Sequence, residues 1–96
     1  MSVYVIISYD ILDRDRYTPY LSGVVPLLKK HGAEIVVADF EAKPLEGEAR
    51  SVYVVLRFPS EEAARSWHAD ADYAPVKQLR FDTCDNNNMV IAKPAS

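Results

Sequence analysis

Four short segments of the chain have the apolar pattern and the residue types of β-strands. The first, Val3–Tyr9, consists almost entirely of β-branched and aromatic residues, which fit the pleated surface of a sheet. The same features predict three further strands, at Ala33–Phe40, Ser51–Phe58 and Met89–Lys93. Between the second and third strands, Glu41–Arg50 is mainly polar and contains Pro44 and Gly47, so we expect a long hairpin connection there.

A helical pattern separates the first two strands. Apolar residues recur there with the 3.6-residue period of an α-helix, at Tyr17, Tyr20, Leu21, Val24, Val25 and Leu28. We expect residues 13–16 to be a polar connector and Thr18 to cap the helix ahead of Pro19. Pro26 should kink the helix by removing one backbone hydrogen bond. Gly32, which follows two lysines and a histidine, predicts the C-terminus.

A second helical pattern follows the third strand. Ser60 is expected to be its N-cap, because two carboxylates come directly after it. One face of this helix carries Ala63, Ala64, Trp67 and His68. Residues 70–72 interrupt the pattern, and a further short helix should begin near Pro75. Asn86–Asn88 predicts a turn before the last strand.

The order of these elements predicts the fold. Two strands with no helix between them form a hairpin, and each helix makes a right-handed crossover between strands. The chain is therefore expected to be a single α+β domain over residues 1–96. Its architecture should be ferredoxin-like, β-α-β-β-α-β, with a four-stranded antiparallel sheet, helices on one face and one extra short helix.

The predicted strands are apolar on both faces, which indicates a partner. Val5 and Ile7 would occupy one face of the first strand, yet Tyr4 and Ile6 make the other face apolar as well. An antiparallel sheet with one solvated face should instead alternate apolar and polar residues. Since the helices can cover only one face, we expect the other to pack against a second copy of the chain in a homodimer.

Composition and charge narrow the classes of function. The formal net charge is −3 with scattered lysines and arginines, so the basic patch of a nucleic-acid-binding protein is missing. The apolar runs are far shorter than the ~20 residues that span a bilayer, and no signal-type segment is evident. The single cysteine, Cys84, cannot form an internal disulfide, which makes a reducing cytoplasm the expected location.

Several short motifs together resemble a known family. They are Tyr4-Val5-Ile6, Tyr20, Leu28, His31-Gly32-Ala33, Leu45-Glu46-Gly47, Val54–Ser60, Ala63-Ala64, Trp67, Tyr73 and Arg80. Together they resemble the domain of unknown function family thirteen-thirty, which lies within the dimeric α/β-barrel superfamily. The resemblance covers nearly the whole chain, and Phe58–Trp67 is its most specific part. Pro19 in the first helix, and Ala33 where the family often has a second glycine, depart from the pattern.

This resemblance implies a homodimer in which two sheets pack face to face into a barrel. Relatives in the superfamily include cofactor-free monooxygenases acting on aromatic compounds, lactone isomerases, haem-handling enzymes and ligand-binding domains of regulators. The fold alone cannot choose among these functions.

No cofactor or metal is expected. The two histidines, His31 and His68, belong to different helices, and the acidic residues after His68 are better explained as a helix terminus. Three scattered glycines cannot form a phosphate-binding loop. No serine occupies a recognisable nucleophile turn. Cys84 lies between acidic neighbours, which disfavour a reactive thiolate.

Six side chains on apolar elements remain as candidates for a small-molecule pocket: Tyr20, Arg57, Trp67, His68, Tyr73 and Arg80. We expect them to converge between the sheet and the helices, because ligand pockets combine an apolar lining with a few polar groups. His68 is the candidate catalytic base, since an unperturbed histidine titrates near neutrality. The others are candidate ligand-binding residues, and the two arginines suit a carboxylate or an enolate oxygen.

Each candidate also has a structural explanation. His68 can be a surface or hydrogen-bonded histidine, the arginines can pair with carboxylates, and the tyrosines can line the core. Glu46 matches a family position, where it can serve catalysis or an interface with the partner. The sequence thus favours a pocket protein that performs cofactor-independent proton transfer or oxygenation on a small anionic or aromatic compound. The alternative is a non-catalytic ligand-binding or dimerisation module.

Overall fold

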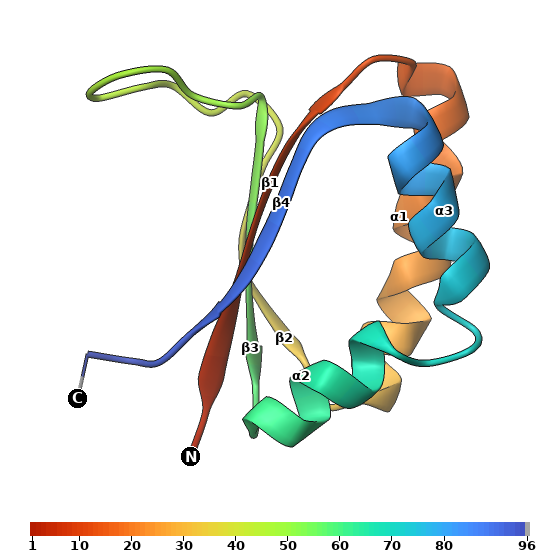
Figure 1. The fold of residues 1–96 in the computed structure, drawn as a ribbon, viewed down its shortest axis with the longest axis vertical. Helices are drawn as coiled ribbons and strands as arrows, with labels where there is room; N and C mark the ends of the chain where they lie inside the picture. The colour runs from red at the N-terminus through yellow and green to blue at the C-terminus, as the bar shows by residue number, and fades with distance from the viewer. Residues whose placement is uncertain (96) are drawn as a thin grey trace.

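A computed structural model describes residues 1–95 and shows one sheet with three helices on one side (Figure 1). The elements, in chain order, are β1 (Val3–Ile11), α1 (Arg14–Lys30), β2 (Glu34–Asp39), β3 (Val52–Phe58), α2 (Glu61–His68), α3 (Ala74–Thr83) and β4 (Cys84–Ala92). The strand order is β2-β3-β1-β4, and every neighbouring pair is antiparallel. The predicted ferredoxin-like α+β fold is confirmed.

The first helix begins one turn earlier than the sequence pattern predicted. Asp13, not Thr18, is the N-cap: its carboxylate accepts a hydrogen bond from the backbone N–H of Arg16 at 3.1 Å. The polar segment expected to be a connector is therefore the first turn of α1. An aspartate cap satisfies a backbone donor that would otherwise lack a partner. The helix then continues through both Pro19 and Pro26.

The C-terminus of α1 and the start of α2 follow the prediction. Gly32 has a φ of +75°, the left-handed conformation that glycine adopts without a steric penalty. Its N–H reaches the Lys29 carbonyl at 3.1 Å, and the next N–H reaches Leu28 at 2.9 Å, which closes the last turn. Ser60 caps α2 by accepting a hydrogen bond from the Ala63 N–H at 3.0 Å.

The last strand is longer than predicted and includes the expected asparagine turn. β4 begins at Cys84, directly after α3, and pairs with β1 along its length. The register shifts between Ser8 and Asp10, and Asn86 has a φ of +55° at this irregularity. Asparagine tolerates that conformation, and its amide donates to the Asp10 carboxylate at 2.9 Å. The segment is thus a bulge within a strand and not a turn.

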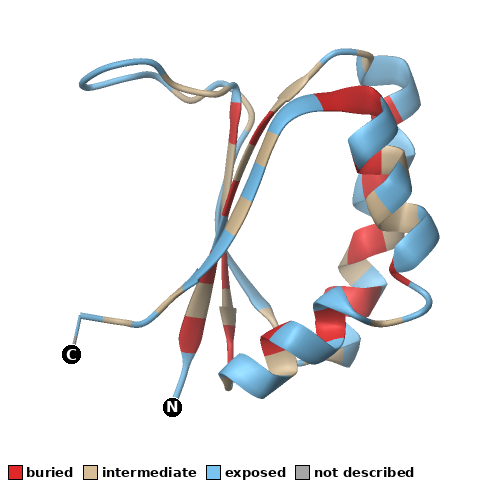
Figure 2. Cartoon of the chain, in the orientation of Figure 1, coloured by how far each residue is buried: buried red, intermediate tan, exposed pale blue. Residues whose placement is uncertain are grey.

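The hydrophobic core lies between the helices and one face of the sheet, and Figure 2 shows the buried residues concentrated there. The sheet contributes alternate residues of β1 and β3, such as Val5 and Leu56. The helices contribute the apolar stripe of α1 together with Trp67 and Tyr73. The strand alternation predicted from the sequence therefore determines which side chains face the helices.

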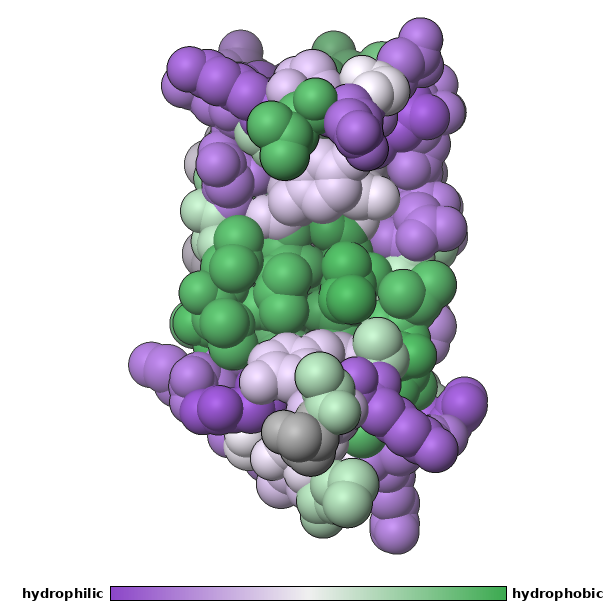
Figure 3. Space-filling view, turned by 90° about the vertical axis from the view of Figure 1, so that its left-hand side faces the viewer, coloured by the Kyte–Doolittle hydropathy of each residue, from purple (hydrophilic) through white to green (hydrophobic). Residues whose placement is uncertain are grey.

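The opposite face of the sheet, which we call the open face, carries a row of four aliphatic residues. Val37 pairs with Val55, Val55 with Ile6, and Ile6 with Val90, so the row crosses all four strands. Figure 3 shows the resulting apolar band across the middle of this face. The connection between β2 and β3, residues 40–51, projects from one end of the sheet on the same side (Figure 1).

Within residues 1–95, no helix has the length and apolar character required to cross a bilayer.

Candidate functional site

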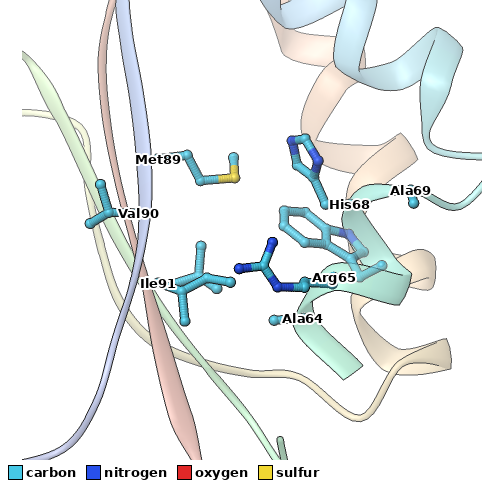
Figure 4. A pocket seen from close by; sticks show the side chains of 9 residues that line it. Ala64, Arg65, His68, Ala69, Met89, Val90 and Ile91 are labelled. Carbon is cyan, nitrogen blue, oxygen red and sulfur yellow. The ribbon is translucent and has the colours of Figure 1, made fainter. Parts of the chain in front are cut away.

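A cavity of about 400 Å³ lies between α2 and the edge of the sheet formed by β1 and β4. Its lining combines apolar groups from the sheet with residues of α2 and the turn after it: Val5, Ala64, Arg65, Trp67, His68, Ala69, Met89, Val90 and Ile91. Figure 4 shows Met89 and Ile91 on the β4 side, facing Arg65 and His68 on the α2 side. We call this space the α2–β4 cavity.

His68 is positioned at the cavity by the last turn of α2. Its imidazole lies beside the ring of Trp67, with centroids 6.0 Å apart, and beside that of Tyr73, at 6.1 Å. Partial burial lowers the pKa of His68, and the positive charges of Lys77 and Arg80 lower it further. The imidazole is therefore neutral at pH 7 and carries a free lone pair, as a general base requires.

Trp67 forms the inner wall of the cavity. The side chain is almost completely buried, and its ring packs on Tyr73 at 4.6 Å and on Phe58 at 5.5 Å between centroids. Its indole Nε1–H has no hydrogen-bond acceptor among the residues that the structure describes. A buried donor without an acceptor carries a desolvation penalty of roughly 1–3 kcal/mol.

Tyr20 and Tyr73 lie in the core beside this wall. Their hydroxyl oxygens are 2.9 Å apart in a buried hydrogen bond between α1 and the start of α3. Burial raises the pKa of Tyr20 far above its usual value, so this hydroxyl stays protonated. Tyr9 and Tyr17 form a similar hydroxyl pair nearby. These tyrosines supply hydroxyl hydrogen bonds and a rigid aromatic surface within the core.

Arg80 is a buried cation in the core. Its side chain is 1% exposed, and its Nη1 donates to the Asn87 side-chain oxygen at 2.6 Å. The guanidinium also lies over the rings of Tyr9 and Tyr20, 5.7 and 5.8 Å from their centroids. Arg80 is therefore a residue of the core and is not among those that line the α2–β4 cavity.

Arg57 does not join this group. It pairs with Tyr4 across β1 and β3, on the open face, and donates to the Glu34 carboxylate at 2.5 Å. The physical reason is strand alternation: Leu56 and Phe58 point to the helices, so Arg57 must point away. Its placement in the pocket was wrong, and the alternative of an ion pair with a carboxylate describes it correctly.

Seven of the nine lining residues were not among the sequence candidates, and two of these, Arg65 and Met89, carry long side chains. Arg65 precedes His68 by three residues in α2. Residues at this spacing lie next to each other on a helix surface, so the spacing could have identified Arg65. Met89 faces the cavity from β4; the predicted strand Met89–Lys93 contained it, but the face on which it lies was not assigned. Arg65 also pairs with Glu61 at 2.8 Å on the solvent side of α2.

The other histidine has a structural role. His31 ends α1, and its Nε2 lies 2.7 Å from the Asp70 carboxylate, which also accepts from Lys30 at 2.8 Å. This links the end of α1 to the turn between α2 and α3. Among residues 1–95, no cluster of three or more histidine, cysteine or acidic side chains is arranged to hold a metal ion.

A family model matches almost the whole chain. The family is described as Domain of unknown function (DUF1330), and the match covers residues 2–94. The chain belongs to this family. No curated protein matched this DUF1330 chain.

Solved structures share its fold at low sequence identity. A protein of unknown function from Rhodopseudomonas palustris superposes with a TM-score of 0.85 at 15% identity, covering 99% of this chain and 83% of that one. A dimeric protein of unknown function with a ferredoxin-like fold, from Bacteroides fragilis, gives 0.60 at 9% identity, covering 97% and 96%. A provisionally assigned antibiotic biosynthesis monooxygenase from Nitrosomonas europaea gives 0.60 at 13%, covering 97% and 90%.

Proposed function

We propose that this DUF1330 protein binds a small, flat anionic or aromatic compound in the α2–β4 cavity. The observation that carries the proposal is the cavity itself, about 400 Å³ with a largely apolar lining, Trp67 as one wall and a neutral His68 at its edge. A volume of this size suits a small organic ligand. The ring of Trp67 at the cavity wall favours an aromatic or conjugated group.

The proposed chemistry is cofactor-independent, with His68 as the catalytic residue. Its lone pair accepts a proton from an acidic O–H or C–H group of the ligand, giving an imidazolium and an enolate or phenolate. In proton transfer, the same proton returns to a different ligand atom. In oxygenation, the electron-rich anion reacts with O₂: a phenol ring C–H becomes C=O, the phenolic O–H becomes the second C=O, and the other oxygen atom leaves as water.

The proposal includes a homodimer that meets through the open face. In the aliphatic row, Ile6, Val37 and Val90 are exposed in one chain and Val55 is half-buried, and exposed apolar bands of this kind mark interfaces. Packing two such faces would bury on the order of 1,600 Å². The dimeric solved neighbour supports this arrangement. Cys84 is a buried free thiol, in keeping with the proposed location in a reducing cytoplasm.

A second candidate function is a dimerisation or ligand-sensing module without catalysis. The observation that favours it is the concentration of apolar surface on the open face, on the far side of the sheet from His68. In that case the cavity either holds a metabolite unchanged or stays empty.

A ligand screen followed by two chemical readouts tests the proposal. Compounds that raise the melting temperature in a metabolite library bind the native state. Each hit is then incubated with the protein in D₂O, to detect deuterium incorporation, and in an oxygen electrode. Catalysis should disappear in His68→Ala and persist in Ser66→Ala, an exposed control on the same helix.

The pH profile gives a further check on His68. Because its pKa is lowered below 6.5, the rate should be constant around neutral pH and decline only below that value. Turnover that is unchanged in His68→Ala would contradict the catalytic assignment. Hits that bind without deuterium exchange or oxygen uptake would favour the sensing module. A library without any hit would contradict the cavity as a ligand site.

A further inference from the structure

A second cavity, of about 70 Å³, lies between α1 and the helix-facing side of β1, β2 and β3. We call it the α1–β2 cavity. Its sheet side follows the strand register, in which Ile7 pairs with Val54 and Val54 with Ala38. Its helix side consists of apolar residues of α1, among them Val24 and Leu28. Ala38 contributes only a methyl group, which leaves part of the space beneath α1 unfilled.

The lining of the α1–β2 cavity is almost entirely hydrocarbon. Ten of its thirteen residues have side chains without a polar atom, and the others are Tyr9, Tyr20 and Trp67. The hydroxyls of the two tyrosines are already hydrogen-bonded to those of Tyr17 and Tyr73. The indole N–H of Trp67 is a single donor, without an acceptor among the described residues. Because a buried water needs several polar partners, the cavity favours an apolar occupant over water.

The size of this cavity and its opening restrict the occupant further. Its volume is about twice the roughly 30 Å³ that a water molecule occupies in the liquid, so only a molecule of a few heavy atoms fits. Two of the lining residues, Leu21 and Ile35, are 37% and 48% exposed. The cavity therefore reaches the solvent between α1 and β2, which gives a small apolar molecule a path of entry.

The α1–β2 cavity adjoins the α2–β4 cavity. Trp67 lines both of them. Consecutive helix-facing residues of β1 also contribute to one cavity each, Val5 to the α2–β4 cavity and Ile7 to the α1–β2 cavity. The side chain of Trp67 thus stands between the space proposed for the organic ligand and a space suited to a small apolar molecule.

We propose that the α1–β2 cavity is a binding site for molecular oxygen. O₂ has two heavy atoms and is apolar, so its transfer from water into a hydrocarbon lining is favourable. The organic ligand of the α2–β4 cavity is too large for this second space. The inference rests on the proposed function, because it names the site that supplies O₂ to the oxygenation. Of the two reactions proposed for His68, it favours oxygenation over proton transfer.

Nuclear magnetic resonance tests O₂ binding directly on the natural chain. Dissolved O₂ is paramagnetic and accelerates the relaxation of nuclei near it, so methyl relaxation is compared under O₂ and under N₂ pressure. The methyl groups of Val24, Leu28 and Leu56, which line the cavity, should show a severalfold greater enhancement than those of Val3 and Val52. These two control residues are similarly buried and line neither cavity.

Two further probes separate entry into the cavity from exposure at the surface. Xenon binds in apolar cavities of proteins, and it should cause saturable chemical-shift changes in the same lining methyl groups. A water-soluble nitroxide larger than the cavity should leave the relaxation of these groups unchanged. Saturable xenon shifts without enhancement by O₂ would reveal an apolar space that O₂ does not occupy, which would overturn the inference.

Variants of β2 test the cavity as the cause of these effects. Ala38→Leu fills the space from the sheet side, so the O₂ enhancement and the xenon shifts should both fall severalfold. Val37→Leu is the matched control, because Val37 pairs with Val55 on the open face, on the other side of the strand. For any screening hit that the protein oxygenates, the KM for O₂ should rise severalfold in Ala38→Leu while the dissociation constant of the organic compound stays the same.

The outcomes distinguish this inference from the broader proposal. Equal O₂ enhancement at lining and control methyl groups would overturn the oxygen site and leave the α2–β4 cavity as a ligand site. A ligand screen without hits would contradict the proposed function, and the relaxation measurements would still decide whether O₂ binds. An unchanged KM for O₂ in a variant that no longer binds O₂ would refute the supply of oxygen from this cavity. Should Ala38→Leu fail to fold, the comparison of methyl groups in the natural chain decides.

Discussion

The hydroxyl of Tyr20 lies 2.9 Å from the hydroxyl of Tyr73, and this buried hydrogen bond joins α1 to the start of α3. The two residues are distant in the sequence, yet Tyr73 stacks on Trp67 while Tyr20 stacks on Tyr17. The pair therefore connects the tyrosines near Arg80 to the aromatic wall of the cavity. Its energy is part of what holds the three helices together over the sheet.

The Tyr20–Tyr73 pair should behave as a coupled unit in a double-mutant cycle. Tyr20→Phe leaves the buried Tyr73 hydroxyl without its partner, and we expect a loss of about 1–3 kcal/mol in the free energy of unfolding. Adding Tyr73→Phe should cost much less than a second such loss, because both hydroxyls are then gone. Urea unfolding of the four proteins gives the coupling energy, and strictly additive losses would show that the hydrogen bond contributes nothing.

A charge in the middle of the open face should prevent dimerisation. Val55 lies in the aliphatic row and pairs with Ile6 and Val37. In Val55→Asp, forming the interface would bury an unpaired carboxylate, so the dissociation constant should rise by on the order of a hundredfold or more. Sedimentation equilibrium at micromolar concentration measures it. Ser66→Asp, on exposed α2 surface, should leave assembly unchanged, and a monomeric natural chain would contradict the interface.

The projecting connection between β2 and β3 should contribute to the same dimer. Leu45, within this connection, is 99% exposed in a single chain, and the connection extends on the side of the open face (Figure 1). Leu45→Ser should weaken the dimer by on the order of tenfold through lost apolar burial. Because the side chain is almost fully exposed in a single chain, the fold should be unaffected. Leu12→Ser, at another exposed leucine, is the control, and equal dimerisation of both variants would exclude Leu45 from the interface.

Asp70 should set part of the acid limit of stability. Hydrogen bonds from Lys30 and His31 lower the pKa of this carboxyl far below its ordinary 3.8. A lowered pKa in the folded state contributes stability above pH 3.8, and this contribution is lost as the pH falls below that value.

Asp70→Asn should therefore reduce the melting temperature at neutral pH, and the difference from the natural chain should shrink on acidification below pH 3.8. Thermal unfolding followed by circular dichroism between pH 2 and pH 7 tests this expectation. Asp72→Asn is a matched control, since Asp72 is 3.9 Å from Lys30 and largely exposed. A constant difference between natural and Asp70→Asn proteins at all pH values would contradict the assignment.

Sequence patterns predicted most elements because their signals are local. Ser60 and Gly32 occupy the cap positions that their side chains suit. The start of α1 was placed too late because Thr18-Pro19 and Asp13 are equally good helix-start signals in the sequence. The structure shows that Asp13 is the N-cap, since its carboxylate accepts a hydrogen bond from the backbone N–H of Arg16. The asparagines of β4 looked like a turn because their pairing with β1 is a long-range contact.

Only part of the candidate site could be predicted from the sequence, because local patterns do not show which segments meet in the folded chain. Trp67 and the exposed His68 line the α2–β4 cavity, whereas Tyr20, Tyr73 and Arg80 are buried in the core outside its lining. Arg57 was misplaced because a strand pattern separates two faces without saying which one the helices cover.

The sequence by itself determined the order of strands and helices, the two apolar faces of the sheet and the identity of the aromatic residues in the core. These properties follow from residue type and periodicity, which act over a few residues. The tertiary structure decided which face the helices cover, that Arg80 is buried without a carboxylate partner among residues 1–95, and that α2 and β4 leave a cavity between them. Those properties depend on the packing of segments that are far apart in the chain. Whether a buried polar group has a hydrogen-bond or ion-pair partner is known only when the positions of all its neighbours are known.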